Sequence, residues 1–301
     1  MSEANKRTHI PVLLNEVLDN FSPAPGERYI DCTAGEGGHS LAIAKLVAPD
    51  GGVLSIELDP LELEVFKEKI EDLGLEGVIE AVHGSFANIA EVAEKNDFVE
   101  PNGILFDLGF SSWQLERSDR GFTFQKNENL DMRFNPGDDA RPTAAEIVNS
   151  YPKEDLEIIF TELGEESRAR VAADAIVKAR RKNKIMTTGD LVNVISSVIP
   201  GGGRINPATK IFQALRMEVN DELANIEKGI ESAMSVVAPG GLIAVITFHS
   251  IEDRLVKQIF KKAVVDERGE LVNKKVIKPE WKEVQENPRS RSAKLRIFRA
   301  M

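Results

Sequence analysis

Short apolar runs alternate with amphipathic segments over the first third of the chain. The apolar runs are rich in β-branched residues, and strands are expected at 29–33, 53–58, 78–83 and 103–108. Between them apolar residues recur at helical spacing, and helices are expected at 38–47, 60–73 and 86–95. Buried strands that alternate with helices are typical of a parallel sheet covered on both faces. The pattern therefore predicts an α/β fold.

The alternation gives way to a long polar segment. Residues 110–142 are rich in polar residues, Gly and Phe and show little periodicity, and a loop of this length is usually functional. Thr143 and Glu146 have the spacing of a capping box, so a helix is expected to begin there. Further helical patterns follow at 153–163, 165–181 and 189–199. The segment 114–206 is therefore predicted to be an all-helical insertion.

The rest of the chain returns to the α/β pattern. Asn206 and Pro207 suit the N-cap and first position of a helix, and apolar residues from Ile211 to Met234 predict one long helix that returns to the sheet. The remaining elements are expected as a helical lead-in at 9–20, a strand at 242–248, a helix from 250, and antiparallel strands at 274–277 and 295–299. The α/β domain is thus predicted to be discontinuous, with residues 1–113 and 207–301.

Composition agrees with a globular chain. Of the 301 residues, 42% are hydrophobic and 29% are charged, which is ordinary for a soluble domain. Because the sequence has neither a run of eighteen apolar residues nor an apolar N-terminal segment, we expect no membrane span and no secretory signal. The single cysteine, Cys32, allows no disulfide within the chain, so a cytoplasmic location is the default expectation.

Charge is distributed unevenly along the chain. The net charge of −11 argues against nucleic acid as a partner, but Arg254–Met301 holds 14 Lys/Arg and 6 Asp/Glu and is therefore net positive. A second basic cluster lies at 168–184. Basic patches on an acidic body bind phosphates if they share one face, and solvated helix faces are the alternative interpretation.

A glycine-rich turn follows the first predicted strand, in the stretch YIDCTAGEGGH from Tyr29 to His39. Its glycines permit positive φ and close approach of a ligand, and the helix behind them offers free N–H groups. Glu57 lies twenty residues after Gly37, at the tip of the next strand, and an acid there suits the two hydroxyls of a ribose. The pattern predicts a site for an adenosine-type cofactor.

Two adenosine cofactors fit a turn of this kind. A nicotinamide cofactor favours G-x-G-x-x-G, and Ser40 stands here in place of the third glycine. S-adenosylmethionine has no pyrophosphate to seat on the helix. Phe86, after the third strand, could form an aromatic wall for adenine, and Asp107 ends the fourth strand at the same edge of the sheet. S-adenosylmethionine is favoured, and a nicotinamide-dependent oxidoreductase is the alternative.

Several ordered motifs resemble one family. They are DCTAGEGGHS, DLGFSSWQLE, RGFTF, LDMRF, INPATKIFQALRMEVNDEL, FHSIEDR and RSRSAKLR. This set, which spans nearly the whole chain, resembles the ribosomal RNA small-subunit methyltransferase H family. The resemblance implies a class I (Rossmann-like) methyltransferase sheet with a helical insertion. It also implies methyl transfer from S-adenosylmethionine to the 4-amino group of a cytidine in the decoding region of small-subunit (16S) ribosomal RNA.

The resemblance also implies site residues. The cofactor contacts it implies are Gly37, Gly38, His39, Glu57, Phe86, Asp107 and Gln114. Glu57 stands where Asp is more usual, and Trp113 stands where Pro is usual. Neither departure removes a donor or an acceptor, so cofactor binding is still expected.

Asp107 is the predicted catalytic residue. Methyl transfer from a sulfonium is an in-line displacement, so positioning is the main task and no metal is expected. A cytosine amino group is a poor nucleophile, and an acceptor on its N–H groups would assist it. Asp107 is predicted to lie near both cofactor and amine; a turn-capping role is the alternative. Carbon-5 methylation would need a cysteine nucleophile, but Cys32 fits a small buried hydrophobe better.

RNA contacts are expected in the long loop and after the fifth strand. A target base has to leave its stack, and aromatic and arginine side chains interleave in the loop. The predicted substrate-binding residues are Ser111, Ser112, Asp131, Arg133, His249 and Arg254. Further phosphate contacts are expected at Arg289, Arg291, Lys294 and Arg296. Some of the loop's aromatic rings could instead form the core of the insertion.

A second interpretation keeps the fold but not the reaction. It is a non-catalytic, RNA-binding factor in ribosome assembly, against which the predicted cofactor site and Asp107 argue. The resemblance implies small-subunit ribosomal RNA as the partner. An acidic body with small basic patches favours an assembled or nearly assembled subunit as the form in which this RNA is bound. The sequence does not determine the oligomeric state, and a homodimer stays open.

Overall fold

The computed structural model describes residues 10–201 and 206–301, so His9 at the start of the predicted lead-in lies outside the described residues. A seven-stranded sheet in the order β3-β2-β1-β4-β5-β7-β6 forms the centre of one part of the molecule. The strands are β1 (Arg28–Asp31), β2 (Gly52–Glu57), β3 (Ile79–His83), β4 (Gly103–Asp107), β5 (Leu242–Thr247), β6 (Gly269–Leu271) and β7 (Lys294–Ala300). The first five are parallel, and β7 is antiparallel to both of its neighbours, so the predicted α/β fold is confirmed.

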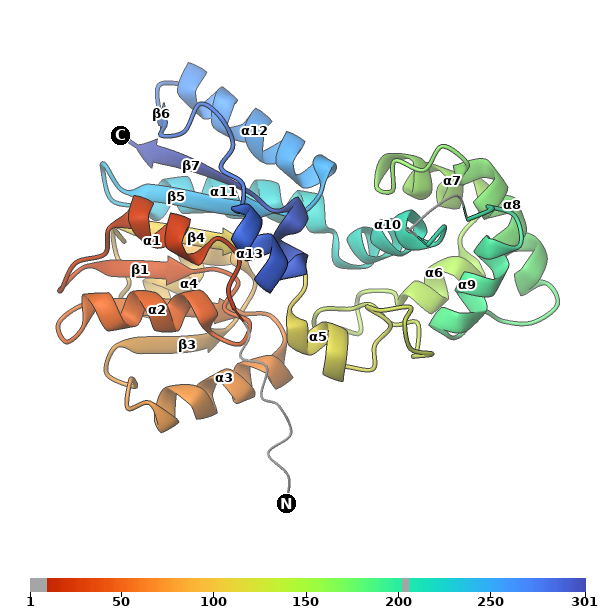
Figure 1. Cartoon of the computed structure of the whole chain (residues 1–301), viewed down its shortest axis with the longest axis horizontal. Coiled ribbons are helices and arrows are strands. Elements are labelled where there is room, and N and C mark those ends of the chain that lie inside the picture. The colour runs from red at the N-terminus through yellow and green to blue at the C-terminus, as the bar shows by residue number, and fades with distance from the viewer. Residues whose placement is uncertain (1–9, 202–205) are drawn as a thin grey trace. The chain divides into compact units, whose positions relative to one another are not determined.

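Helices cover both faces of this sheet (Figure 1). The helices of this unit are α1 (Leu14–Phe21), α2 (Gly38–Val47), α3 (Pro60–Asp72), α4 (Ile89–Lys95), α11 (Glu222–Val236), α12 (Ser250–Val265) and the short, exposed α13 (Trp281–Glu286), with 3-10 turns at η1 (Phe86–Asn88) and η2 (Pro288–Ser292). Successive strand residues enter opposite cores: Ile30 packs with α4, α11 and α12, and Tyr29 packs with α1, α2 and α3. Each buried Ile or Leu stabilises the fold by about 1.5–3 kcal/mol.

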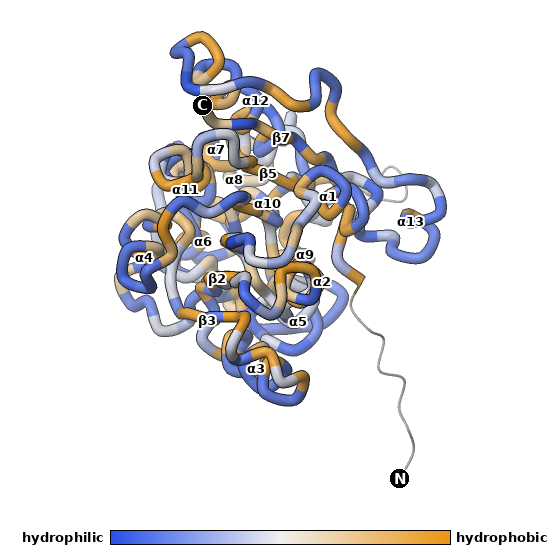
Figure 2. Tube along the Cα trace, turned by 90° about the vertical axis from the view of Figure 1, so that its left-hand side faces the viewer, coloured by the Kyte–Doolittle hydropathy of each residue, from blue (hydrophilic) through white to orange (hydrophobic). Residues whose placement is uncertain are grey.

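Hydropathy follows the same plan. In Figure 2 the central strand β5 is hydrophobic, whereas many of the connecting loops are hydrophilic. Strands buried on both faces are expected to be apolar throughout, since neither face meets water. Within the part of the chain that the structure describes, no helix is both long enough and apolar enough to cross a bilayer.

The chain folds as two compact units. The first comprises the described residues up to Gly109 together with Leu223–Met301, and the second is Phe110–Glu222. The helices of the second unit are α5 (Ser112–Arg117), α6 (Ala144–Ser150), α7 (Lys153–Glu162), α8 (Ala169–Arg180), α9 (Thr188–Ser196) and α10 (Thr209–Asn220). Their apolar faces meet in a core of their own, which includes Phe160 and Leu215.

The long helix predicted from Ile211 to Met234 is wrong. It is interrupted at Asp221, whose φ of 50° is in the left-handed region that commonly ends a helix. The first half, α10, packs against α6 and α7. The second half, α11, packs on the sheet through Ile226 and Ile230. The helical unit, Phe110–Glu222, thus extends beyond the predicted insertion at 114–206 at both ends.

The predicted strand at 274–277 is also wrong. Only Ile277 makes an isolated bridge, to Leu295, and β6 lies earlier in the chain. Asn273 explains the early end of β6, because its side chain replaces the backbone in the ladder. The amide of Asn273 accepts from Ile297 N at 2.7 Å and donates to Leu295 O at 3.1 Å.

Candidate active site

The glycine-rich turn connects β1 to α2 at the carboxyl edge of the sheet. Gly37 precedes the helix with a φ of 84°, and a Cβ there would lie 1.9 Å from the ring of Phe66. A Cβ on Gly38 would lie 2.4 Å from Pro11. The turn thus requires glycine for its backbone conformation and for packing, in addition to any ligand. The two packing partners, Phe66 and Pro11, could not be predicted from the spacing of the glycines.

Glu57 ties the end of β2 to this turn. Its Oε2 accepts from Gly35 N and its Oε1 accepts from Asp59 N, both at 2.8 Å. Burial raises the pKa of Glu57 to about 7. A carboxylate oxygen has two lone pairs, so each oxygen can accept one more hydrogen bond. The arrangement fits two vicinal hydroxyl donors, as in a ribose.

Three buried polar side chains beside the turn are connected by hydrogen bonds. Ser55 Oγ donates to Ser40 Oγ at 2.8 Å, and Ser40 Oγ donates to Asp31 Oδ2 at 2.6 Å. All three side chains are buried, and burial raises the pKa of Asp31. Ser40, which stands in place of the third glycine of the nicotinamide motif, therefore has a structural role, because its hydroxyl donates a hydrogen bond to Asp31. Asp31 was not among the predicted site residues, although its position at the end of a strand is a signal in the sequence.

Asp107 ends β4, the strand next to β1. Its N–H donates to Thr33 Oγ1 at 2.6 Å, and its Oδ2 lies 3.7 Å from His39 Nε2. Its Oδ1 is buried and accepts no hydrogen bond from the residues that the structure describes. Burial and the negative charges of Asp31 and Glu252 raise the pKa of Asp107 well above its usual value. This oxygen, which the described residues leave without a donor, lies at the edge where the cofactor is expected.

His249 and Glu252 contact each other just after the end of β5. The backbone of Glu252 donates to His249 Nδ1, and His249 Nε2 lies 2.9 Å from Glu252 Oε1. The Glu252 side chain is fully buried and caps α12 through Phe248 N and His249 N. Both ring nitrogens of His249 therefore face Glu252, and its expected contact with substrate stays a prediction. The same holds for Arg254, which is exposed on α12.

Phe86 begins the 3-10 turn η1 after β3. Its ring contacts Phe106 edge-on, with centroids 5.8 Å apart. A Cβ on Gly229 of α11 would lie 2.8 Å from this ring, so glycine makes room for Phe86. Phe86 is only partly buried, and its role as a wall for adenine stays a prediction.

The second unit positions other predicted residues. Ser111 Oγ accepts from Gln114 N at 3.0 Å, and Gln114 Oε1 accepts from Ser111 N at 3.2 Å, which makes a capping box for α5. Ser112 is the first residue of this helix, and Gln114 is buried. The cap explains the order of this segment, while the expected cofactor and RNA contacts of these residues stay predictions.

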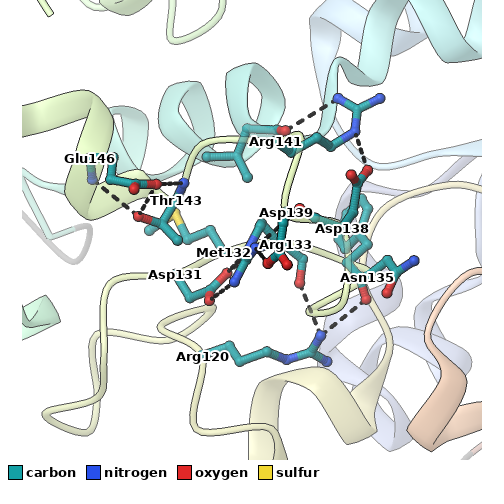
Figure 3. A network of polar contacts seen from close by, with 12 residues as sticks. Arg120, Asp131, Met132, Arg133, Asn135, Asp138, Asp139, Arg141, Thr143 and Glu146 are labelled. Atoms are coloured by element: carbon teal, nitrogen blue, oxygen red, sulfur yellow. Dashed lines mark hydrogen bonds and ion pairs between the residues drawn. The ribbon is translucent and has the colours of Figure 1, made fainter. Parts of the chain in front are cut away.

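Asp131 and Arg133 bind each other (Figure 3). Arg133 donates to both carboxylate oxygens of Asp131, at 2.8 and 2.9 Å. Arg120 in turn donates to the carbonyl oxygens of Arg133 and Phe134. This network orders the loop that showed no periodicity, and the predicted RNA contacts of Asp131 and Arg133 would use groups already paired.

The aromatic rings of the same loop divide into two kinds. Phe124 contacts Phe212 edge-on beside the helical core, and Phe122, which is 8% exposed, stacks between Phe110 and Phe134. Phe110 is 40% exposed, and the guanidinium of Arg216 lies 5.0 Å from its centroid. Core packing thus accounts for Phe122 and Phe124, whereas Phe110 keeps exposed ring surface.

The sheet, with antiparallel β7 between β5 and β6 and the glycine-rich turn, Glu57 and Asp107 at the carboxyl ends of its strands, is a class I (Rossmann-like) methyltransferase sheet. The chain has this fold, and S-adenosylmethionine is its cofactor. The two carboxylate oxygens of Glu57 fit the ribose hydroxyls of this cofactor as hydrogen-bond acceptors. Comparison with known proteins identifies the family. Residues 6–301 match the family model described as the MraW methylase family, and the chain belongs to that family.

Similar proteins share nearly the whole length. A protein of Elusimicrobium minutum is 44% identical over 97% of this chain and 98% of its own length. A protein of Persephonella marina is 43% identical over 96% of this chain and 98% of its own length. A protein of Dehalococcoides mccartyi is 41% identical over 96% of this chain and 85% of its own length. All three are named ribosomal RNA small subunit methyltransferase H, so the resemblance seen in the motifs is confirmed.

Proposed function

We propose that this protein transfers a methyl group from S-adenosylmethionine to the 4-amino group of a cytidine in the decoding region of small-subunit ribosomal RNA. The names of the relatives support the RNA substrate. The observation that carries the proposed reaction is the buried Oδ1 of Asp107, an acceptor with no hydrogen bond from the described residues. An exocyclic amine is a donor that such an acceptor would bind.

The cofactor would be held at the carboxyl edge of the sheet. Glu57 would accept hydrogen bonds from the ribose hydroxyls, and Phe86 would cover the adenine. Gly37 and Gly38 would contact the methionine part through their backbone, and Gln114 is the further contact expected from the family. When bound, the sulfonium supplies an electrophilic methyl group that needs no metal.

Asp107 would position the amine and receive its proton. The bound cofactor would supply the methyl group to the amine nitrogen, and the proton that this nitrogen has to lose would pass to the Asp107 carboxylate. Because burial raises the pKa of Asp107 well above its usual value, its carboxylate is a better proton acceptor than an exposed one. His39, whose Nε2 lies 3.7 Å from Oδ2, would hold the carboxyl group in place.

The variant Asp107→Asn tests this role. The amide keeps the shape but cannot accept a proton, so transfer of labelled methyl to small subunits that lack the modification should fall at least about 100-fold. Binding of S-adenosylhomocysteine, measured by calorimetry, should change by much less. Asp72→Asn, at an exposed position in α3, is the control with the same change in charge.

The outcomes separate the two functional hypotheses. Loss of transfer with retained RNA binding supports an enzyme in which Asp107 acts on the amine. Transfer by Asp107→Asn at the rate of the control would contradict the role of Asp107. Absence of transfer by the unaltered protein, with cofactor binding intact, would favour a non-catalytic assembly factor.

A further inference from the structure

A basic segment, defined here as residues 274–291, lies on the sheet-containing unit. It holds six exposed cations: Lys274, Lys275, Lys278, Lys282, Arg289 and Arg291. Trp281, at the start of α13, is 74% exposed. An exposed tryptophan among cations is unusual for a surface that only faces water, because aromatic area is usually buried.

Cations elsewhere in this unit are neutralised far more often. Lys69 pairs with Glu36, Lys95 with Glu91, Lys262 with Asp266, Arg268 with Glu231, Arg299 with Glu270, and both Lys294 and Arg296 with Asp253. Lys294 and Arg296 were predicted to contact phosphate, and their pairing leaves the neighbouring basic segment as the stronger candidate. Counting only described residues, Lys278, Lys282 and Arg291 have no carboxylate partner.

The basic segment is anchored to the body of the unit. Leu13 N donates to Glu283 Oε1 at 2.9 Å, and Asn287 Nδ2 donates to Ile10 O at 3.0 Å. Ser290 is fully buried and closes the turn by donating to Asn287 O. Glu283 is thus engaged in the anchor, and the six cations exceed the three glutamates of the segment. A fixed backbone that presents unpaired charge and an aromatic ring is prepared to bind a ligand.

We infer that the basic segment is a binding surface for single-stranded RNA, with its cations on phosphates and Trp281 stacked on an unpaired base. Stacking on an exposed ring beside phosphate-binding cations is the general mode of single-strand recognition. An acidic protein would satisfy the cations but would not use the flat ring in this way. The inference rests on the proposed function, because the RNA would be the substrate outside the methylated nucleotide.

Three variants of the full-length protein test this surface. Trp281→Ala should weaken binding of protein-free small-subunit ribosomal RNA about tenfold, and Trp281→Phe should restore most of the affinity because it keeps a ring. The triple change Lys278→Glu, Lys282→Glu and Arg291→Glu should lower the slope of log Kd against log salt by about 2, since each phosphate contact with a single strand contributes about 0.7.

A matched control separates this surface from overall charge. Lys45, Lys257 and Lys261 are exposed and have no ion pair within the described part of the chain, and their change to Glu alters net charge equally. Equal loss in both triple variants would overturn the inference, as would loss of binding to assembled subunits without loss on protein-free RNA, which would indicate a protein partner. Because each variant's S-adenosylhomocysteine affinity and thermal melting are measured in parallel, misfolding is recognised separately.

Failure of this inference is distinguishable from failure of the proposed function. If the unaltered protein methylates small subunits and the basic-segment variants do so at equal substrate affinity, only the inference is wrong. If the unaltered protein binds no RNA and methylates none, both are wrong.

Discussion

At the scale of single residues, three acids at strand ends dominate the site: Asp31 and Glu57 are buried, and Asp107 is partly buried. Asp31, Glu57 and Asp107 each have a pKa raised chiefly by burial. Only part of this could be predicted from the sequence. The positions of Glu57 and Asp107 followed from strand ends, but the pairing of Asp131 with Arg133 and of His249 with Glu252 depends on side-chain directions that spacing does not give.

Cofactor affinity should depend on pH through Glu57. Because the pKa of Glu57 is about 7, its carboxyl group is largely protonated below pH 7 in the cofactor-free protein. Ribose hydroxyl donors favour the carboxylate, so binding lowers this pKa and releases a proton. The affinity for S-adenosylhomocysteine should therefore rise as pH increases from 6 to 7, by up to about tenfold per unit, and level off above. Calorimetry in buffers of different ionisation enthalpy measures both effects.

Glu57→Gln is the control for this pH dependence. It should bind about tenfold more weakly at pH 8, because a charge-assisted hydrogen bond is lost, and should lack the proton release. An unchanged slope in Glu57→Gln would mean that another group causes the dependence.

Ser40 should contribute measurably to stability. In Ser40→Ala the buried Asp31 loses its side-chain donor, so the free energy of unfolding should fall by about 1–3 kcal/mol. Ser55→Ala removes a donor whose acceptor, Ser40, still bonds to Asp31, and it should cost less. Urea unfolding at pH 7 measures both; a larger loss in Ser55→Ala would contradict the role given to Ser40.

At the scale of elements, the predictions from sequence were most accurate where the residues of a helix or strand alone determine its periodicity. The parallel strands and the helices between them follow from local periodicity. The break between α10 and α11 does not, because apolar spacing continues through Asp221 and only packing against α6 and α7 assigns α10 to the helical unit. The early end of β6 likewise depends on Asn273, whose partners are more than twenty residues away.

The turn between β1 and α2 gives a prediction at this scale. Gly37→Ala should lower the free energy of unfolding by about 2–4 kcal/mol, because strain at positive φ adds to the overlap with Phe66. Gly26 is a matched control, with a φ of 88° and no atom within 4 Å of an added Cβ. Gly26→Ala should cost about 1 kcal/mol from strain alone. Equal losses in the two variants would show that Phe66 moves away freely.

At the scale of the whole molecule, an acidic chain is combined with a localised basic surface. The net charge of −11 alone argued against nucleic acid, and the excess of cations near the C-terminus reversed that interpretation. The structure refines it further, since Lys294 and Arg296 are paired with Asp253 while Lys278 and Lys282 are exposed. Composition could not separate these two groups because ion pairs form between residues distant in sequence.

The identity of the methylated nucleoside tests the central claim most directly. Small subunits from cells that lack this protein would be incubated with the purified chain and S-adenosylmethionine, and the ribosomal RNA digested and analysed by mass spectrometry. The account predicts a cytidine methylated on its 4-amino group, within a fragment from the decoding region. A methyl group on carbon 5, on a ribose or on another base would contradict it.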